Sequence, residues 1–247
     1  QPDEFTILKE EDFEEENRQL VEALKQRDIL PLKSTDQKLN TLLKLVGFHT
    51  GDGSFNNNGD STFYADEEDL ESIQEDIESL GFNPSKVYSR ERDHSVKGYE
   101  FDRTEYSIKS TSRALQKLLI KLGAPEGTKT QEYFTLPNYL EKLEGWQKAL
   151  YLSAFFGAEM SSPKAQTRKN LYCPKISQNK AIEVENSGRE FMKEVKQILQ
   201  ELGIETNKVE EFEAEENQNG KVKRFRLGIK NDSHNLLNFY QKIGYRY

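Results

Sequence analysis

The sequence predicts an α+β fold built by pseudo-twofold duplication of an αββαββα half, with two antiparallel sheets and one apolar helix of each half at a central seam. Two segments predict the duplication: LVGFHTGDGS at 45–54 and LSAFFGAEMS at 152–161. Each is an apolar run containing small residues, and each ends in a carboxylate, Asp52 or Glu159. The elements expected after each run follow the same order, which is typical of an internal repeat.

In the first half, the polar segment 53–65 becomes strand-like at its end. An acidic amphipathic helix is predicted over 66–82, with Gly81 as its stop. Strands follow at 85–92 and 98–110. A helix over 111–125, capped by Thr111 or Ser112 and stopped by Gly123, closes this half.

The second half repeats this order, with a long polar segment, a helix, two strands and a last helix. These elements are expected at 161–184, 187–204, 206–216, 220–230 and 233–245. SLGFNPSKVY at 79–88 matches ELGIETNKVE at 201–210, so about 15 additional residues must lie around 162–184. We therefore expect three units: an extension at 1–35, a first half at 36–135 and a second half at 136–247.

The extension lies outside the repeat. A helix is predicted over roughly 10–27, followed by a connector in which Pro31 disfavours continuation. We expect residues 1–35 to serve as a packing extension.

Composition limits the class of protein. The single cysteine, Cys173, excludes an internal disulfide framework and fits a reducing compartment. The acidic start lacks the pattern of a signal peptide, and the apolar run 149–158 is too short to span a bilayer. A cytoplasmic protein without membrane association is expected.

The net charge of −8 is unevenly distributed. Residues 1–27 hold nine acids and four bases, and residues 66–78 hold eight acids and no base. The remaining sequence has 26 acids and 31 bases. This mildly basic remainder permits a nucleic-acid surface.

The two acid-tipped runs predict a metal site. Gly47 and Ala154 are small enough to let two helices approach closely, which would bring Asp52 and Glu159 together at the helix ends. Two carboxylates there repel each other and face the negative ends of both helix dipoles. A divalent cation relieves both penalties, and oxygen ligands suit Mg²⁺.

The two runs resemble the motif of the LAGLIDADG homing endonucleases, reading L-V-G-F-H-T-G-D-G at 45–53 and L-S-A-F-F-G-A-E-M at 152–160. The resemblance covers about 36–247 and is closest to archaeal members, including those carried in inteins. It implies a monomer whose two sheets form a saddle over the DNA major groove. It also implies site-specific double-strand DNA cleavage with Mg²⁺, or Mn²⁺, as the cofactor. The implied metal ligands are Asp52 and Glu159, with Gly51 and Ala158 beside them.

The sequence departs from the family pattern at several positions. Position six, often acidic in the family, is Thr50 or Gly157, and the final glycine of the second motif is Met160. His49 replaces an apolar residue, and we interpret it as a packed histidine. Two alternatives therefore stay open: a LAGLIDADG scaffold that binds DNA or RNA without catalysis, and a relic intein endonuclease domain or structural insertion.

An endonuclease of this class also needs a cation near the scissile phosphate. Lys109 and Lys230 occupy matching places before the last helix of each half and are the candidates, although exposed lysines at strand ends are common. Residues expected to bind DNA from the strands and the enlarged segment are Lys86, Arg90, Arg92, Arg103, Arg168, Lys169, Lys175, Gln178, Lys208, Lys223, Arg224 and Arg226. Strand alternation separates Lys223 from Arg224 and Arg226, but it leaves open which face meets DNA.

Intein splicing is not expected of this chain. It begins with Gln1 and ends in Gly-Tyr-Arg-Tyr, whereas splicing uses an initial Cys or Ser and a final His-Asn. An intein origin would make it the endonuclease part alone.

Overall fold

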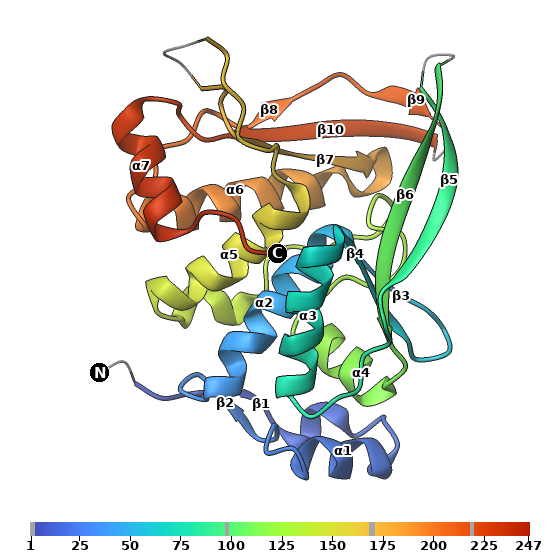
Figure 1. Ribbon diagram of the computed structural model, residues 1–247. Coiled ribbons are helices and arrows are strands. Elements are labelled where there is room, and N and C mark those ends of the chain that lie inside the picture. The colour runs from blue at the N-terminus through green and yellow to red at the C-terminus, as the bar shows by residue number, and fades with distance from the viewer. Residues whose placement is uncertain (1–2, 97–98, 168–170, 218–219) are drawn as a thin grey trace.

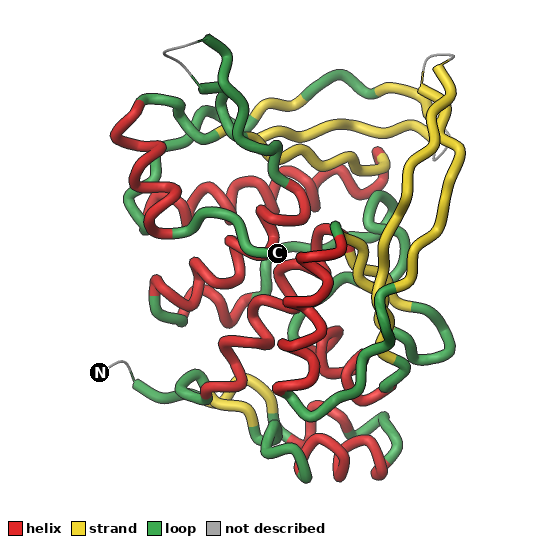
Figure 2. The backbone as a smooth tube through the Cα atoms, in the orientation of Figure 1, coloured by secondary structure: helices red, strands yellow, loops and turns green. Residues whose placement is uncertain are grey.

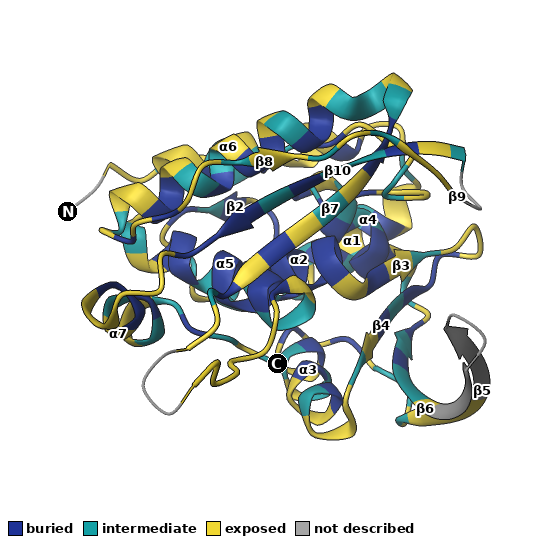
Figure 3. Ribbon diagram, turned by 90° about the horizontal axis from the view of Figure 1, so that it is seen from above, coloured by how far each residue is buried: buried dark blue, intermediate teal, exposed yellow. Residues whose placement is uncertain are grey.

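Two helices cross the centre of the protein. The computed structural model describes residues 3–96, 99–167, 171–217 and 220–247. In it, α2 (Gln37–Asp52) and α5 (Gly145–Glu159) pack directly against each other between the two halves (Figure 1). Both helices are largely buried, as their dark blue segments in the middle of Figure 3 show. The seam predicted from the two acid-tipped runs is therefore a central helix pair.

The first half carries a four-stranded antiparallel sheet in the order β3-β4-β6-β5. Its strands are β3 (Gly53–Phe55), β4 (Ser61–Ala65), β5 (Tyr88–Val96) and β6 (Tyr99–Ser110). The helices α3 (Glu67–Ser79) and α4 (Arg113–Lys121) complete this half. Gly81 after α3 and Gly123 after α4 both adopt positive φ, +82° and +96°, as expected of helix stops. Ser112 is the cap of α4, because its Oγ accepts a hydrogen bond from the Leu115 amide.

The second half is built around β10 (Gly220–Gly228), which pairs antiparallel with β7 (Lys175–Ala181) on one side. On its other side lie two short strands, β8 (Glu210–Glu211) and β9 (Glu215–Asn217). The helices α6 (Glu185–Glu201) and α7 (Ser233–Lys242) complete the half, with single-turn helices at Asn138–Lys142 and Ile182–Val184. Figure 2 shows the strands of both halves along the top and right of the view, with most of the helices below and to the left.

The two halves differ at their first strand. The αββαββα order predicted for both holds in the first half, where β3 follows α2 directly. In the second half, the described residues between α5 and β7 contain only an isolated bridge, between Ala165 and Leu171. Among the described residues between Met160 and β7, the predicted first strand is therefore represented by this bridge alone.

The extension packs on the first half but differs from its prediction. The single helix expected over 10–27 is two pieces, a short helix at Glu10–Phe13 and α1 (Arg18–Lys25), because Asn17 caps α1 by accepting from the Gln19 amide. Strands β1 (Thr6–Leu8) and β2 (Leu32–Lys33) pair beside them.

The α+β class and the antiparallel sheets confirm the predicted fold class. Among the described residues, none of the helices has both the length and the apolar character needed to cross a bilayer.

Candidate active site

The site is created by the close approach of α2 and α5. A Cβ added to Gly47 would collide with the carbonyl oxygen of Tyr151, and one added to Gly51 would lie 2.8 Å from the Cγ of Glu159. The hydroxyl of Thr50 lies 3.1 Å from the Tyr151 hydroxyl across the same seam. The helices therefore meet backbone to backbone at Gly47, and at their C-terminal ends Gly51 packs against the side chains of Ala158 and Glu159.

This contact sets the two motif acids side by side. Asp52 is the last residue of α2 and Glu159 is the last residue of α5, and both side chains reach the molecular surface. The surrounding protein reduces the solvation of Glu159 and the charge of Asp52 repels it, which together raise the pKa of Glu159 to about 7. A positive charge near this pair would lower the cost of its mutual repulsion.

Lys129 supplies one positive charge. Its Nζ donates a hydrogen bond to the carbonyl oxygen of Gly51, in the last turn of α2. Burial lowers the pKa of Lys129 to about 8, although the charges of Glu159 and Asp52 act in the opposite direction. The ammonium group thus lies against both carboxylates and satisfies a carbonyl at a helix end.

Sequence reasoning missed Lys129. The residue lies in the linker between α4 and α5, beyond the segments that match between the two halves, so the comparison of the halves gives no signal for it. Lys109 and Lys230, which were chosen from the symmetry of the repeat, have other partners than Asp52 and Glu159.

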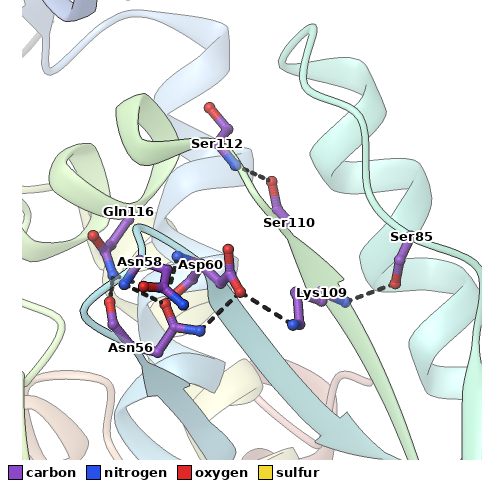
Figure 4. A network of polar contacts seen from close by, with 8 residues as sticks. All are labelled: Asn56, Asn58, Asp60, Ser85, Lys109, Ser110, Ser112 and Gln116. Carbon is purple, nitrogen blue, oxygen red and sulfur yellow. Dashed lines mark hydrogen bonds and ion pairs between the residues drawn. The ribbon is translucent and has the colours of Figure 1, made fainter.

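Lys109 and Lys230 are each held by a carboxylate of a neighbouring loop. The Nζ of Lys109 lies 3.1 Å from Asp60, within the network that orders the β3–β4 loop around Asn56 (Figure 4). The Nζ of Lys230 lies 2.5 Å from Glu205. Their role as catalytic cations stays a prediction.

His49 has the packing role inferred from the sequence. Its ring is fully buried, stacks on Phe55 at 3.8 Å and meets the edge of Phe63 at 5.5 Å. Burial first, and the charge of Lys129 second, lower the pKa of His49 to about 3. A histidine that stays neutral at physiological pH supports the turn after Asp52 by packing.

An acidic cleft opens beside Asp52. Its volume is about 550 Å³, and it is bounded by the ends of α2 and α5, the start of α3, and parts of β4 and β6. Asp66, Asp69 and Glu105 line it together with Asp52. Reduced solvation and the neighbouring charges of Asp66 and Glu68 raise the pKa of Asp69. A polyanion that approaches this cleft needs cations to offset the repulsion from these acidic side chains.

The second sheet has a helix-covered face and an outer face. Lys223, Phe225 and Gln178 share the face against α6, where Lys223 forms ion pairs with Glu185 and Glu211 at 3.1 and 2.9 Å. Lys223 and Gln178 thus lie on the helix side of the sheet, and their contact with DNA stays a prediction.

Arg224 and Arg226 lie on the outer face, with Lys175 exposed on the neighbouring strand. The guanidinium groups of Arg224 and Arg226 lie 5.6 and 4.6 Å, respectively, from the ring centroid of Phe212. Each also has a carboxylate partner at 3.7 Å, Glu215 for Arg224 and Glu210 for Arg226. Such long, partly exposed pairs hold their partners weakly.

The other residues expected to bind DNA divide into two groups. Lys86, Arg90 and Lys208 are exposed. Arg92 and Arg103 are direct partners in the β5–β6 register, but their side chains lie outside the described residues, as do Arg168 and Lys169 altogether.

The donor set at the seam fits a hard divalent cation. Asp52 and Glu159 offer carboxylate oxygens and Ala158 offers a carbonyl oxygen near a helix end, while the Gly51 carbonyl, the fourth expected ligand, already accepts from Lys129. Within the described part of the chain, no group of three or more His, Cys, Asp or Glu side chains is placed to hold a metal. Two carboxylates suit Mg²⁺, which keeps waters and takes phosphate oxygens as its remaining ligands.

Comparison with known proteins gives a consistent result. Residues 146–244 match the family described as LAGLIDADG-like domain. The chain is 32% identical to the tRNA-splicing ligase RtcB of Methanopyrus kandleri, over 99% of this chain and 24% of that protein. It is 33% identical to the protein of the same name in Pyrococcus furiosus, over 98% of this chain and 25% of that protein.

A protein with a different name matches the same region. The chain is 31% identical to the DNA-directed RNA polymerase subunit Rpo1N of Methanocaldococcus jannaschii, over 92% of this chain and 17% of that protein. The chain thus spans about a quarter, or less, of the length of these relatives. Residues 146–244, which include α5 with Glu159 at its end, are therefore a LAGLIDADG-like domain.

Proposed function

We propose that this protein is a site-specific double-strand DNA endonuclease that hydrolyses phosphodiesters with a divalent metal ion. The observation that carries the proposal is the placement of Asp52 and Glu159 at adjoining helix ends, with the Lys129 ammonium beside them. Nucleases need an arrangement of this kind, because a phosphodiester gains negative charge as it is attacked.

The proposed roles follow from the donor set. Asp52 and Glu159, with the carbonyls of Gly51 and Ala158, would hold Mg²⁺ or Mn²⁺. The bound cation would activate water and neutralise charge on the phosphate. Lys129 would stabilise the charge that develops on the same phosphate, and the outer faces of the two sheets would bind the duplex. Because one chain carries both acids, we propose that it acts as a monomer.

The relatives support an inserted origin. A ligase and an RNA polymerase subunit share no activity in their names, yet the same region of this chain matches a fraction of each. A mobile segment that inserts into unrelated genes produces this pattern. We therefore propose that the chain is an intein-associated endonuclease that acts in the cytoplasm, and that its DNA target is an uninterrupted copy of a gene of this kind.

The test uses DNA of such an uninterrupted gene, together with a randomised DNA library, incubated with the protein and Mg²⁺. We expect cleavage at one sequence, loss of cleavage on chelation, and a fall of at least about a thousandfold in rate for Asp52→Asn. DNA affinity should be retained. Asp36→Asn is the matched control, because Asp36 is an acid at the other end of the same helix, where its carboxylate accepts from the Lys33 amide, and it should cleave normally.

Cleavage by Asp52→Asn at the wild-type rate would exclude the proposal. Tight binding without nicking in Mg²⁺ or Mn²⁺ would instead favour the alternative, a scaffold that binds DNA or RNA. The observation in favour of that alternative is that Lys109 and Lys230 are already paired with carboxylates.

A further inference from the structure

A second lysine of this molecule is buried and has a defined set of partners. Lys180 lies in β7, on the face of the sheet that α6 covers, and none of its side chain is exposed. A lysine in such a place is costly unless its polar atoms are satisfied. The contacts that satisfy it all belong to one segment of the linker, residues 129–134.

The partners of Lys180 are acceptors that suit the N–H donors of its amino group. Its Nζ donates hydrogen bonds of 2.7 Å to the carbonyl oxygens of Lys129 and Glu132, and lies 3.6 Å from the centroid of the Phe134 ring. An amine and an ammonium group both keep the two hydrogens that the carbonyls need. The first of these carbonyls belongs to Lys129 itself.

Other bonds attach the same segment to the second half. The amide of Ala181 donates to the carbonyl of Thr130 at 2.8 Å, and the hydroxyl of Ser187 bonds to both the amide and the carbonyl of Phe134. Lys129 then extends from this anchored backbone to the Gly51 carbonyl of the first half. The linker is therefore fixed on one half while its lysine reaches the helix end of the other.

We propose that Lys180 is a positioning residue for Lys129. By holding the Lys129 carbonyl, it fixes the point from which the Lys129 side chain extends, so that the ammonium group stays beside Asp52 and Glu159. The inference rests on the proposed endonuclease function for its catalytic consequence, but the placement of Lys129 can be measured without cleavage.

The test compares Lys180→Met, Lys129→Met and the double variant in single-turnover cleavage with Mg²⁺ and in DNA binding. We expect Lys180→Met to cleave at least about tenfold more slowly while its Kd for DNA stays within about twofold. The double variant should be no slower than Lys129→Met, because one residue acts through the other. Lys148→Met is the matched control: Lys148 is another nearly buried lysine of the second half, paired with Glu201, and its loss should leave the rate unchanged.

A wild-type rate for folded Lys180→Met, or single effects that multiply in the double variant, would overturn the proposal. If Lys180→Met does not fold, Lys180→Gln keeps an NH₂ donor group on a shorter side chain, and the expected result is an intermediate rate. A folded Lys180→Gln that cleaves like the wild type would overturn the proposal equally.

Mn²⁺ binding to the protein alone, followed by electron paramagnetic resonance, separates this inference from the function. Removing or misplacing the Lys129 ammonium should raise the affinity of the protein for Mn²⁺. We expect the same increase in Lys129→Met and in the double variant. Lys180→Met should shift the affinity in the same direction. If the wild type cleaves no DNA but these affinities shift as stated, the proposed function fails and the positioning role stands. If Lys129→Met shifts the affinity and Lys180→Met does not, the positioning role fails.

Discussion

At Gly47 and Gly51, the lack of a side chain lets α2 and α5 meet backbone to backbone. The obstacle that a Cβ at Gly47 would meet is the Tyr151 carbonyl, which belongs to rigid helix backbone and cannot rotate away. The geometry of the acid pair therefore depends on residues that carry no chemistry. The same reasoning applies to Gly157, where an added Cβ would collide with the Arg246 carbonyl.

Gly47→Ala should accordingly destabilise the protein, although alanine is the better helix former. We expect the free energy of unfolding to fall by about 2 kcal/mol, because the helices must separate to admit the methyl group. Urea denaturation measures the change. Gly145→Ala is the control, since its Cβ would meet only the flexible end of Leu202 at 3.1 Å, and it should change stability little. Equal effects of the two substitutions would contradict the packing argument.

At the scale of the element, features encoded by local sequence signals could be predicted, whereas features that depend on pairing with distant segments could not. The ends of α3 and α4 were predictable because Gly81, Gly123 and Ser112 encode them locally. The reduction of the first strand of the second half to a bridge, among the described residues, was not predictable, because a strand forms only where a partner edge is available. The sequence also did not determine which face of β10 packs against α6. Alternation along a strand defines two faces but not which of them a helix covers.

The candidate site divides in the same way. Repetition of the motif identified Asp52 and Glu159, and the structure brings them together. Repetition could not identify Lys129, because the linker occurs once. The reliance on symmetry led instead to Lys109 and Lys230, whose carboxylate partners come from loops that no local pattern foretells.

Lys180 in strand β7 should make the free energy of unfolding depend on pH. Burial lowers the pKa of Lys180 from its ordinary 10.5 to about 7, with Glu132 acting against the shift. Between pH 7 and 10.5 the unfolded chain therefore binds a proton at this residue that the folded protein has lost. Its contribution makes the free energy of unfolding rise with pH, by about 1 kcal/mol per unit.

Lys180→Met removes this contribution. Urea denaturation of both proteins at pH 7 and pH 9 should give a smaller increase for Lys180→Met than for the wild type. Parallel changes in the two proteins would show that Lys180 keeps its proton in the folded state.

At the scale of the whole molecule, each half contributes one sheet, and the α2–α5 pair lies between the halves (Figure 1). The net charge of −8 belongs mostly to the extension and α3, away from the outer arginines of the second sheet. Binding of a duplex should therefore depend on a few exposed cations and not on the overall charge.

The double variant Arg224→Ala/Arg226→Ala should weaken DNA binding and lower the slope of log K against log salt by about 1 for each arginine. Titrations at several salt concentrations measure the slope. Lys223→Ala, a neighbour on the helix-covered face, should leave the slope unchanged. A reduced slope for Lys223→Ala alone would reverse the assignment of the two faces.

The cation at the acid pair gives the molecule a direction. The duplication relates Asp52 to Glu159 and one sheet to the other, whereas Lys129 comes from the linker that joins the two halves. The two strands of a bound duplex would thus meet chemically different surroundings, one with the linker cation and one without it. A protein that appears symmetric in its fold is polar along its substrate.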